Sequence, residues 1–273
     1  MYVLSMEKKI AVLSMLVEGN SVRSIERVIG VHRDTILRLM VSVGQKCEEV
    51  LDRSLRNLPC KEIECDEIWT YVSKKQKRIK PEEDELEIGD QYVFVALDPK
   101  TKLIPTYTVG KRTGATTLEF MWDLKNRIKH RFQLTTDRFV GYFKAVEAAF
   151  GANIDYAQLQ KVYYSDGNGH REGYSPSDLQ GTEITLMTGQ PKMEKVCTSY
   201  VERQNLTIRM QLRRFTRLTN AFSKKLGNLK AALALHFYFY NFCRVHLTLR
   251  MTPAMKAGLT DHIWEWSELL TDG

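Results

Sequence analysis

The 273-residue chain lacks the features that mark several large protein classes. Its five cysteines are scattered and form no CxxC pair, so neither a disulfide framework nor a zinc ribbon is indicated. The longest apolar run, AALALHFYFYNFC, is too short and interrupted for a membrane span, and the N-terminal residues show no signal-peptide pattern. No internal repeat or nucleophile–base motif is present. We therefore expect a cytoplasmic protein in a reducing compartment, with no membrane partner.

Acidic residues are missing from one long segment. Residues 203–230 carry eight basic side chains and no acidic one, directly after an isolated glutamate, Glu202. With Arg244, Arg250 and Lys256 the positive charges number eleven, which exceeds the whole-chain net charge of +7. Local basicity of this kind favours nucleic acid as a partner, although a solvated helix face is the alternative. Apolar residues at helical spacing predict one helix over 201–230.

The first sixty residues predict three helices, over 7–18, 21–29 and 33–43. The third helix is expected to end at Gly44. The second and third, around a glycine turn, resemble a helix-turn-helix. Arg33, Thr35 and Arg38 would then lie near the start of the recognition helix, where base edges are read. A plain three-helix packing module is the alternative, because this segment is only mildly basic.

From about residue 61 the pattern becomes that of an α/β domain. Three strands, a helix, a strand, a helix and a strand precede the basic helix; they are expected at 62–72, 91–98, 103–110, 115–130, 131–137, 141–151 and 161–166. Residues 74–90, a basic block followed by an acidic one, predict an exposed hairpin loop. We predict a helix-turn-helix domain over 1–58 and an α/β domain over 59–273.

Three carboxylates from distant positions could converge at one edge of this sheet. Asp66 lies in the first strand beside Trp69, Asp137 follows the fourth strand, and Glu202 precedes the basic run. Such a set is an oxygen-rich site for hard cations such as Mg²⁺. Two ions could activate an attacking oxygen and stabilise the leaving oxygen of a phosphodiester, with no covalent protein nucleophile.

The interval between Asp137 and Glu202 is 65 positions, so we expect it to hold an insertion. The Gly/Ser-rich segment 165–183 is predicted to form this insertion as a surface loop. It contains Asp166, which follows its own short strand and is the alternative second carboxylate. His170 is expected to be a loop residue rather than a ligand.

The segments CDEIWTYV, TTDRFVGY, YVERQNLTIRMQLRRFTRLTNAFSKK and YNFCRVHLTLRMTPAMKAGLT resemble DDE transposases of bacterial insertion sequences, over nearly the whole chain from about residue 20. The resemblance implies a ribonuclease H-like α/β core, a mixed sheet flanked by helices, behind a small all-α helix-turn-helix domain. It implies that Asp66, Asp137 and Glu202 bind two Mg²⁺ or Mn²⁺ ions. The implied activity is metal-dependent DNA cleavage and strand transfer at the terminal repeats of the element.

Double-stranded DNA is the expected partner, both as element ends and as target, and a homodimer or larger homo-oligomer is expected because two ends must be held. The residues expected near DNA phosphates lie in the basic segment: Arg203, Asn205, Arg209, Arg213 and Arg214. Arg244 and His246, in the terminal YNFC motif, are expected near the DNA ends.

Two other functions fit the same residues. One is a non-catalytic DNA-binding regulator or a decayed transposase, and the other is a ribonuclease or structure-specific nuclease on the same fold. The helix-turn-helix favours transposition, because a nuclease of RNA–DNA hybrids has no need to read duplex sequence, and fold alone does not choose the reaction.

Overall fold

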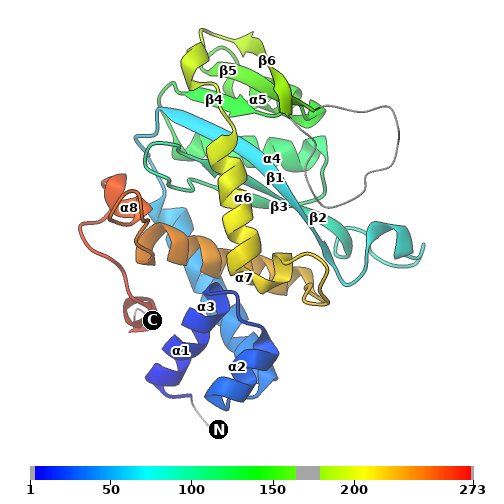
Figure 1. Ribbon diagram of the computed structural model, residues 1–273, viewed down its shortest axis with the longest axis vertical. Helices are drawn as coiled ribbons and strands as arrows, with labels where there is room; N and C mark the ends of the chain where they lie inside the picture. Colours follow the sequence, from blue (N-terminus) through cyan, green and yellow to red (C-terminus); the bar gives the residue numbers. More distant parts are fainter. Residues whose placement is uncertain (1–3, 164–178, 272–273) are drawn as a thin grey trace.

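A computed structural model describes residues 4–163 and 179–271 and is built around a six-stranded sheet (Figure 1). In chain order the strands are β1 (Glu62–Val72), β2 (Gly89–Leu97), β3 (Tyr107–Gly110), β4 (Gln133–Thr136), β5 (Asp155–Tyr163) and β6 (Leu179–Thr188). Their order across the sheet is β3-β2-β1-β4-β5-β6. β1, β4 and β5 are parallel, whereas β2 and β6 run antiparallel to their neighbours. The predicted ribonuclease H-like mixed sheet is confirmed.

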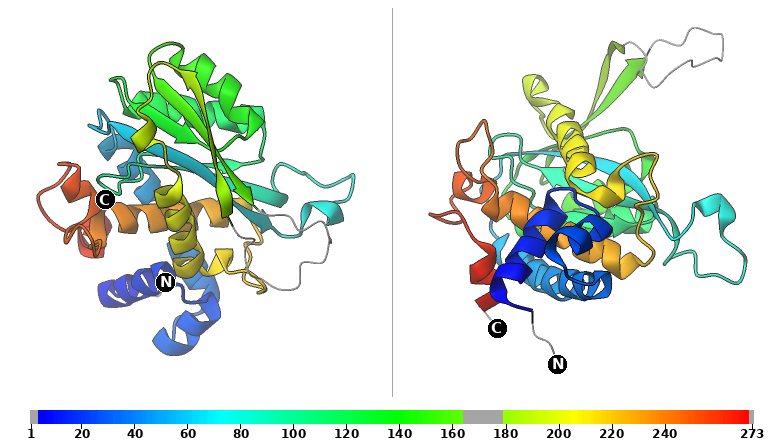
Figure 2. Two further views of the ribbon diagram at one scale, coloured as in Figure 1. Left: turned by 45° about the horizontal axis from the view of Figure 1, so that its top comes forward. Right: turned by 60° about the horizontal axis from the view of Figure 1, so that its bottom comes forward.

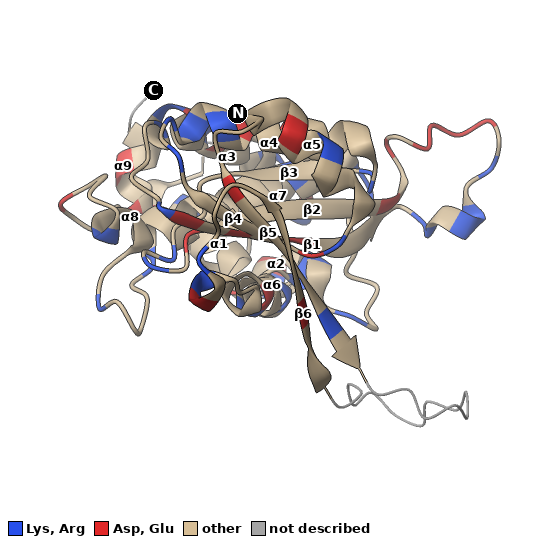
Figure 3. Ribbon diagram, turned by 90° about the horizontal axis from the view of Figure 1, so that it is seen from above, with Lys and Arg blue, Asp and Glu red and all other residues tan. Residues whose placement is uncertain are grey.

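Helices cover both faces of the sheet (Figure 3). α4 (Gly114–Arg127) and α5 (Val140–Phe150) pack on one face, and α6 (Ser199–Gln211) packs on the other, against β1 and β2. Because both faces are covered, the end of β2 is buried without interruption from Val93 to Leu97. A helix on each face means that neighbouring residues of β1 have different surroundings.

The N-terminal helices are α1 (Met6–Val17), α2 (Val22–Ile29) and α3 (Arg33–Ser54). The predicted α2 is confirmed with both of its caps: the Ser21 side chain accepts the Ser24 N–H, and Gly30 adopts a left-handed conformation with φ of 71°. α3 is longer than predicted, because Gly44 does not end it. Gly44 faces α7 (Leu226–Tyr238), where a Cβ would lie 2.7 Å from the Cβ of Ala231. This glycine allows the two helices to pack closely.

One continuous cluster of buried apolar side chains runs from α1 and α3 into the sheet and the C-terminal helices. α3 packs along the length of α7, as Figure 1 shows. The predicted division into two domains at residue 58 therefore stays a prediction. The C-terminal part contains a π-helix (Phe239–Cys243), α8 (Pro253–Lys256) and α9 (Trp266–Thr271). Asn241 anchors it, since its side chain exchanges two 3.0 Å hydrogen bonds with the backbone of Ile104.

The basic segment does not form the predicted continuous helix over 201–230. α6 ends at Gln211, and α7 begins only at Leu226, with a short 3₁₀ turn between them. Arg213 has an arginine four positions away on either side, and such like-charge pairs destabilise a helix. The backbone instead reaches the end of β1, where the Ser73 N–H donates to the Ser223 carbonyl at 2.8 Å. The prediction of one helix is wrong for this reason.

The expected insertion follows β5. Asp166 and His170 lie outside the described residues, so the alternative second carboxylate has no placement. Residues 179–183 belong to β6, and the prediction of a loop up to 183 is wrong there. β6 pairs with β5 from Tyr156–Thr188 to Tyr163–Leu179 and forms a hairpin that projects from the body of the molecule (Figure 2). The β1–β2 loop projects in the same way.

Every helix within residues 4–163 and 179–271 is too short or too polar to serve as a membrane span.

Candidate active site

β1 carries four acidic side chains, and three of them, at positions 64, 66 and 67, lie on the two faces of the sheet near the candidate site. Because successive residues of a strand point to opposite faces, Glu64 and Asp66 face α6, whereas Glu67 faces the side of α5. Asp66 is held by two hydrogen bonds of 2.8 Å: its Oδ1 accepts the Glu67 N–H, and its Oδ2 accepts the side-chain amide of Asn205. Asn205 therefore orients Asp66 from α6.

Glu64 fixes the start of α6. Its Oε2 accepts the N–H groups of Tyr200 and Val201, each at 3.0 Å, while the N-cap residue Thr198 makes no capping bond with its side chain. A carboxylate at this position meets the positive end of the helix dipole. Burial nevertheless raises the pKa of Glu64 to about 7, against the effect of these two hydrogen bonds. The contact sets where the first turn of α6, which carries Glu202, lies on β1.

The three predicted carboxylates, Asp66, Asp137 and Glu202, line one cavity of about 550 Å³. They come from β1, from the residue after β4 and from α6, so segments far apart in the sequence meet here. The cavity is also lined by three basic side chains: Arg112, Arg138 and Lys161.

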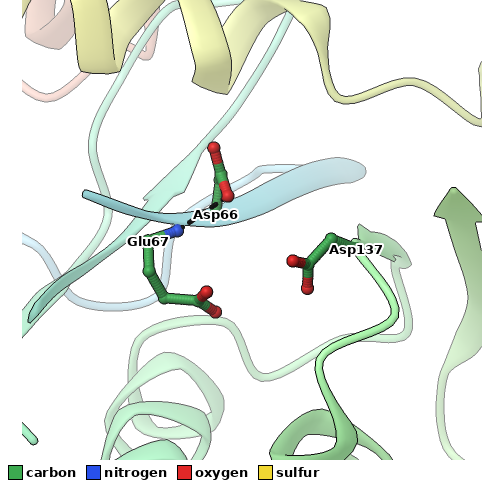
Figure 4. Close-up of side chains that lie close together, drawn as sticks. All are labelled: Asp66, Glu67 and Asp137. Carbon is green, nitrogen blue, oxygen red and sulfur yellow. Dashed lines mark hydrogen bonds between the residues drawn. The ribbon is translucent and has the colours of Figure 1, made fainter. Parts of the chain in front are cut away.

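A tighter group of carboxylates lies on one side of this cavity. Asp66, Glu67 and Asp137 each offer an oxygen, and these oxygens lie within 4.8 Å of one another (Figure 4). They could hold a divalent metal ion. Glu202 is not part of this group: it forms an ion pair with Lys161 and accepts the Thr198 hydroxyl at 2.8 Å.

Burial and mutual repulsion disfavour the charged forms of these carboxylates. Burial raises the pKa of Asp66 to about 6, and the charges of Asp137 and Glu202 act in the same direction. Burial likewise raises the pKa of Glu67 to about 7, with the charge of Asp137 adding to it. Like charges held together in this way favour a bound cation.

Two basic side chains pair with carboxylates of this cavity, and no pattern in the sequence indicates either of them. Arg112 places its Nη2 3.1 Å from Glu67 Oε2 and 3.5 Å from Asp137 Oδ2. Lys161 pairs with Glu202. The sequence analysis also did not single out Glu67. Its position directly after Asp66, in a strand that is otherwise rich in apolar residues, could have indicated it.

The predicted DNA contacts are distributed over two regions. Arg33 and Arg38 are exposed on the first turns of α3, where Thr35 is half-buried. On α6, Arg203 is exposed, whereas Asn205 is buried and faces Asp66. The contact of Asn205 with DNA phosphates stays a prediction, since its side-chain amide donates to Asp66 within the protein.

A basic groove of about 880 Å³ separates the N-terminal helices from the turn after α6. Its charged lining residues are five basic side chains and one acidic one: Arg23, Arg33, Arg213, Arg214, Lys224 and Asp34. Arg214 reaches inward, where it contacts the Ser223 hydroxyl and the Met40 sulfur, each at 3.0 Å, and burial lowers its pKa to about 10. The groove brings residues of the predicted recognition helix next to the basic segment.

The remaining predicted contacts lie nearer the core. Arg209 is half-buried, and its Nη1 is 3.4 Å from the Phe215 carbonyl oxygen. Arg244 and His246 follow the π-helix and are also half-buried. Burial, together with the charges of Lys102 and Arg244, lowers the pKa of His246.

No known family model and no curated protein matches the sequence. Distant structural similarity connects the chain to Mos1 mariner transposase. It aligns with the Mos1 strand transfer complex at 14% identity and a TM-score of 0.25, over 57% of this chain and 59% of that one. The Mos1 paired-end complex with left transposon end and the Mos1 mariner paired end complex with Mn each align at 12% identity and a TM-score of 0.24, over 57% of this chain and 60% of theirs. The chain thus spans about three fifths of the length of those structures.

Proposed function

We propose that the protein is a DDE-type transposase, which cleaves and joins DNA strands with divalent metal ions. The observation that carries this proposal is the meeting of Asp66, Asp137 and Glu202, from three separate elements, in one cavity. Clustered carboxylates next to a local excess of basic residues suit an enzyme that handles both metal ions and a polyanion.

The side chains present fit divalent metal ions, because the acidic donors are hard oxygen ligands and oxygens of Asp66, Glu67 and Asp137 lie within 4.8 Å of one another. Asp66, Asp137 and Glu202 would hold the ions. Bound Mg²⁺ or Mn²⁺ would lower the barrier to attack on phosphorus and stabilise the leaving oxygen. Asn205 keeps the carboxylate of Asp66 directed at the cavity, and Glu64 sets the position of Glu202 through the start of α6.

The proposed reaction is hydrolysis followed by strand transfer. A water oxygen forms a bond to phosphorus, the bond from phosphorus to the 3′ oxygen breaks, and that oxygen leaves as a 3′-hydroxyl after taking up a proton. The 3′-hydroxyl then attacks a phosphodiester of the target DNA in the same way. Both steps exchange one P–O bond for another.

DNA ends would be recognised by the N-terminal helices. Arg33, Thr35 and Arg38 would read bases from the start of α3, and Arg213 lines the basic groove together with Arg33. We propose that the functional form is at least a dimer, since two ends of an element must be brought together.

The test is cleavage of duplex DNA that carries the terminal repeats flanking the gene, in Mg²⁺ or Mn²⁺. Wild type is compared with Asp66→Asn and Glu202→Gln, and with Glu147→Gln as a control for a carboxylate exposed on α5. We expect metal-dependent 3′-hydroxyl ends from wild type and from Glu147→Gln only. Full activity of Glu202→Gln would overturn the assignment of Glu202. Specific DNA binding without cleavage in every protein would instead identify a regulator.

A further inference from the structure

Arg112 is placed where the carboxylates, the cavity and an aromatic surface meet. It lies between the end of β3 and the start of α4 and contacts both Glu67 and Asp137. Its side chain is 39% exposed and lines the same cavity as the three predicted ligands. An arginine here is next to any phosphate that binds the carboxylate-held ions.

Glu67 is built to hold this arginine. Its Oε2 accepts Arg112 Nε at 3.2 Å and lies 3.1 Å from Nη2, so the contact is made by two nitrogens. Its other oxygen, Oε1, is buried, and the Glu67 side chain is only 3% exposed. Both contacts with Arg112 are therefore made by Oε2. Figure 4 shows the Glu67 carboxylate directed toward Asp137, on the other side of β1 from Asp66.

Aromatic rings fix the plane of the guanidinium. Arg112 lies over the Phe139 ring at 4.2 Å from its centre, and 5.9 Å from the centre of the Tyr92 ring. A guanidinium has five N–H donors. Within the described residues its Nη1 has no hydrogen-bond partner. Arg112 is thus oriented by contacts on two sides while donors remain for a ligand in the cavity.

We propose that Arg112 contacts the phosphate that undergoes reaction, with Glu67 as its positioning residue; this inference rests on the proposed function. A guanidinium matches phosphate oxygens with paired hydrogen bonds, which a lysine does not reproduce. Its fixed charge stabilises the negative charge that develops on the phosphate oxygens during attack. When a divalent ion binds Asp137, Glu67 still holds Arg112 at the edge of the cavity.

The experiment measures Mn²⁺ binding and DNA cleavage separately, on the full chain. The variants are Arg112→Gln, Arg112→Lys and Glu67→Gln. Arg131→Gln is the matched control, because Arg131 also pairs with an aspartate, Asp155, and is 41% exposed outside the cavity. Calorimetric titration gives the affinity for Mn²⁺ without DNA, and cleavage of the terminal-repeat duplex at saturating Mn²⁺ gives kcat and KM.

We expect Arg112→Gln to reduce kcat by about 100-fold, because the charge that stabilises the reacting phosphate is lost. The variant should bind Mn²⁺ at least as tightly as wild type, because a competing cation has been removed. Arg112→Lys should recover only part of this loss. Glu67→Gln should change Mn²⁺ affinity by less than about threefold and reduce kcat, and the double variant should be no slower than Arg112→Gln, since the two residues act as a unit.

If Arg112→Gln cleaves DNA with the same kcat as wild type, the inference is overturned while the proposed function stays intact. A tenfold or greater loss of Mn²⁺ affinity in Glu67→Gln would show that Glu67 is a metal ligand and not a positioning residue. A wild-type protein that binds Mn²⁺ but cleaves no DNA would overturn the proposed function and this inference together.

Discussion

Three acidic residues within four positions of β1 have three different partners. Glu64 binds the backbone at the start of α6, Asp66 binds Asn205, and Glu67 binds Arg112. Because side chains alternate along the strand, Glu67 faces the opposite side of the sheet from the other two. Glu64 and Asp66 face the same side, but their partners lie at different positions along α6. Substitutions at neighbouring positions should therefore have different effects.

Sequence reasoning could find Asp66 and not its neighbours. An acid in an apolar strand is a local signal, as is a glutamate at the start of an acid-free segment such as Glu202. Arg112 has no local signal, because its role depends on the chain after β3 reaching Asp137, which follows a strand elsewhere in the sheet. Glu64 has none either, since its partners are backbone N–H groups 136 and 137 positions away.

Asp66→Asn should stabilise the metal-free protein at pH 8 and leave it unchanged near pH 3. Burial and neighbouring charges raise the pKa of Asp66 to about 6, from about 3.9 in an unfolded chain. The folded state thus holds this proton more tightly, and the stability that the proton contributes is lost as pH rises through 6. Thermal unfolding in a chelator should show a difference of a few degrees at pH 8. Equal melting temperatures for both proteins at pH 8 would contradict the raised pKa.

Mg²⁺ should raise the melting temperature of wild type more at pH 8 than at pH 5, because protons compete with the metal for Asp66. Glu147→Gln should respond as wild type does, and Asp66→Asn should respond little. A metal-dependent rise of the same size in Asp66→Asn would place the bound ion elsewhere.

At the scale of elements, caps were easier to predict than lengths. Ser21 and Gly30 bound α2 through local backbone geometry, which the sequence shows directly. The end of α6 depends on repulsion between arginines and on pairing of Ser223 with the end of β1, which periodicity does not register. β6 was missed because its sequence follows a Gly/Ser-rich segment and its faces are only partly buried.

Glu64→Ala should destabilise the protein by roughly 1–3 kcal/mol, because two N–H groups at the start of α6 lose their acceptor in a buried position. Glu64→Gln keeps a carbonyl oxygen that can accept these bonds and should lose much less. Denaturant unfolding near neutral pH compares the two variants. Equal losses would show that the carboxylate charge, not the hydrogen bonds, holds α6.

Gly44→Ala and Gly227→Ala should shift stability in opposite directions, although both glycines are helical. A Cβ at Gly44 would meet Ala231 at 2.7 Å and force α3 away from α7, which costs roughly 1–3 kcal/mol. A Cβ at Gly227 meets nothing within 4 Å, so the alanine should stabilise α7 by roughly 0.5–1 kcal/mol. Unfolding in urea gives both values, and a neutral Gly44→Ala would disprove the close packing.

At the scale of the whole molecule, the mixed sheet was expected from the family resemblance, and it is confirmed. β4 and β5, which α5 joins, are parallel neighbours, and β1 and β2, which a loop joins, are antiparallel neighbours. The basic groove could not be predicted, because it forms only where the N-terminal helices meet the turn after α6.

Arg213→Ala and Arg38→Ala should weaken DNA binding in different ways. Arg213 lines the basic groove, so its loss should reduce affinity for all duplexes alike and lower the slope of log affinity against log salt by about 1. Arg38, exposed near the start of α3, should affect the terminal repeats more than random DNA. Fluorescence anisotropy over a range of salt concentrations measures both. Equal losses on both DNAs for Arg38→Ala would argue against base reading by α3.

The length of α3 has a further consequence for where DNA would be cut relative to the bases that are recognised. It runs unbroken for 22 residues, about 33 Å, from Arg33 to a C-terminal end where the Leu51 and Leu55 carbonyls accept Arg127. Arg127 closes α4, whose opposite end begins just after Arg112. Under the proposed function, α3 and α4, joined at these ends, would set the distance between the bases that α3 reads and the phosphate that is cut. One residue inserted in α3 would move its start by about 1.5 Å and turn it by about 100°, so the cut would fall at a different base pair or not at all.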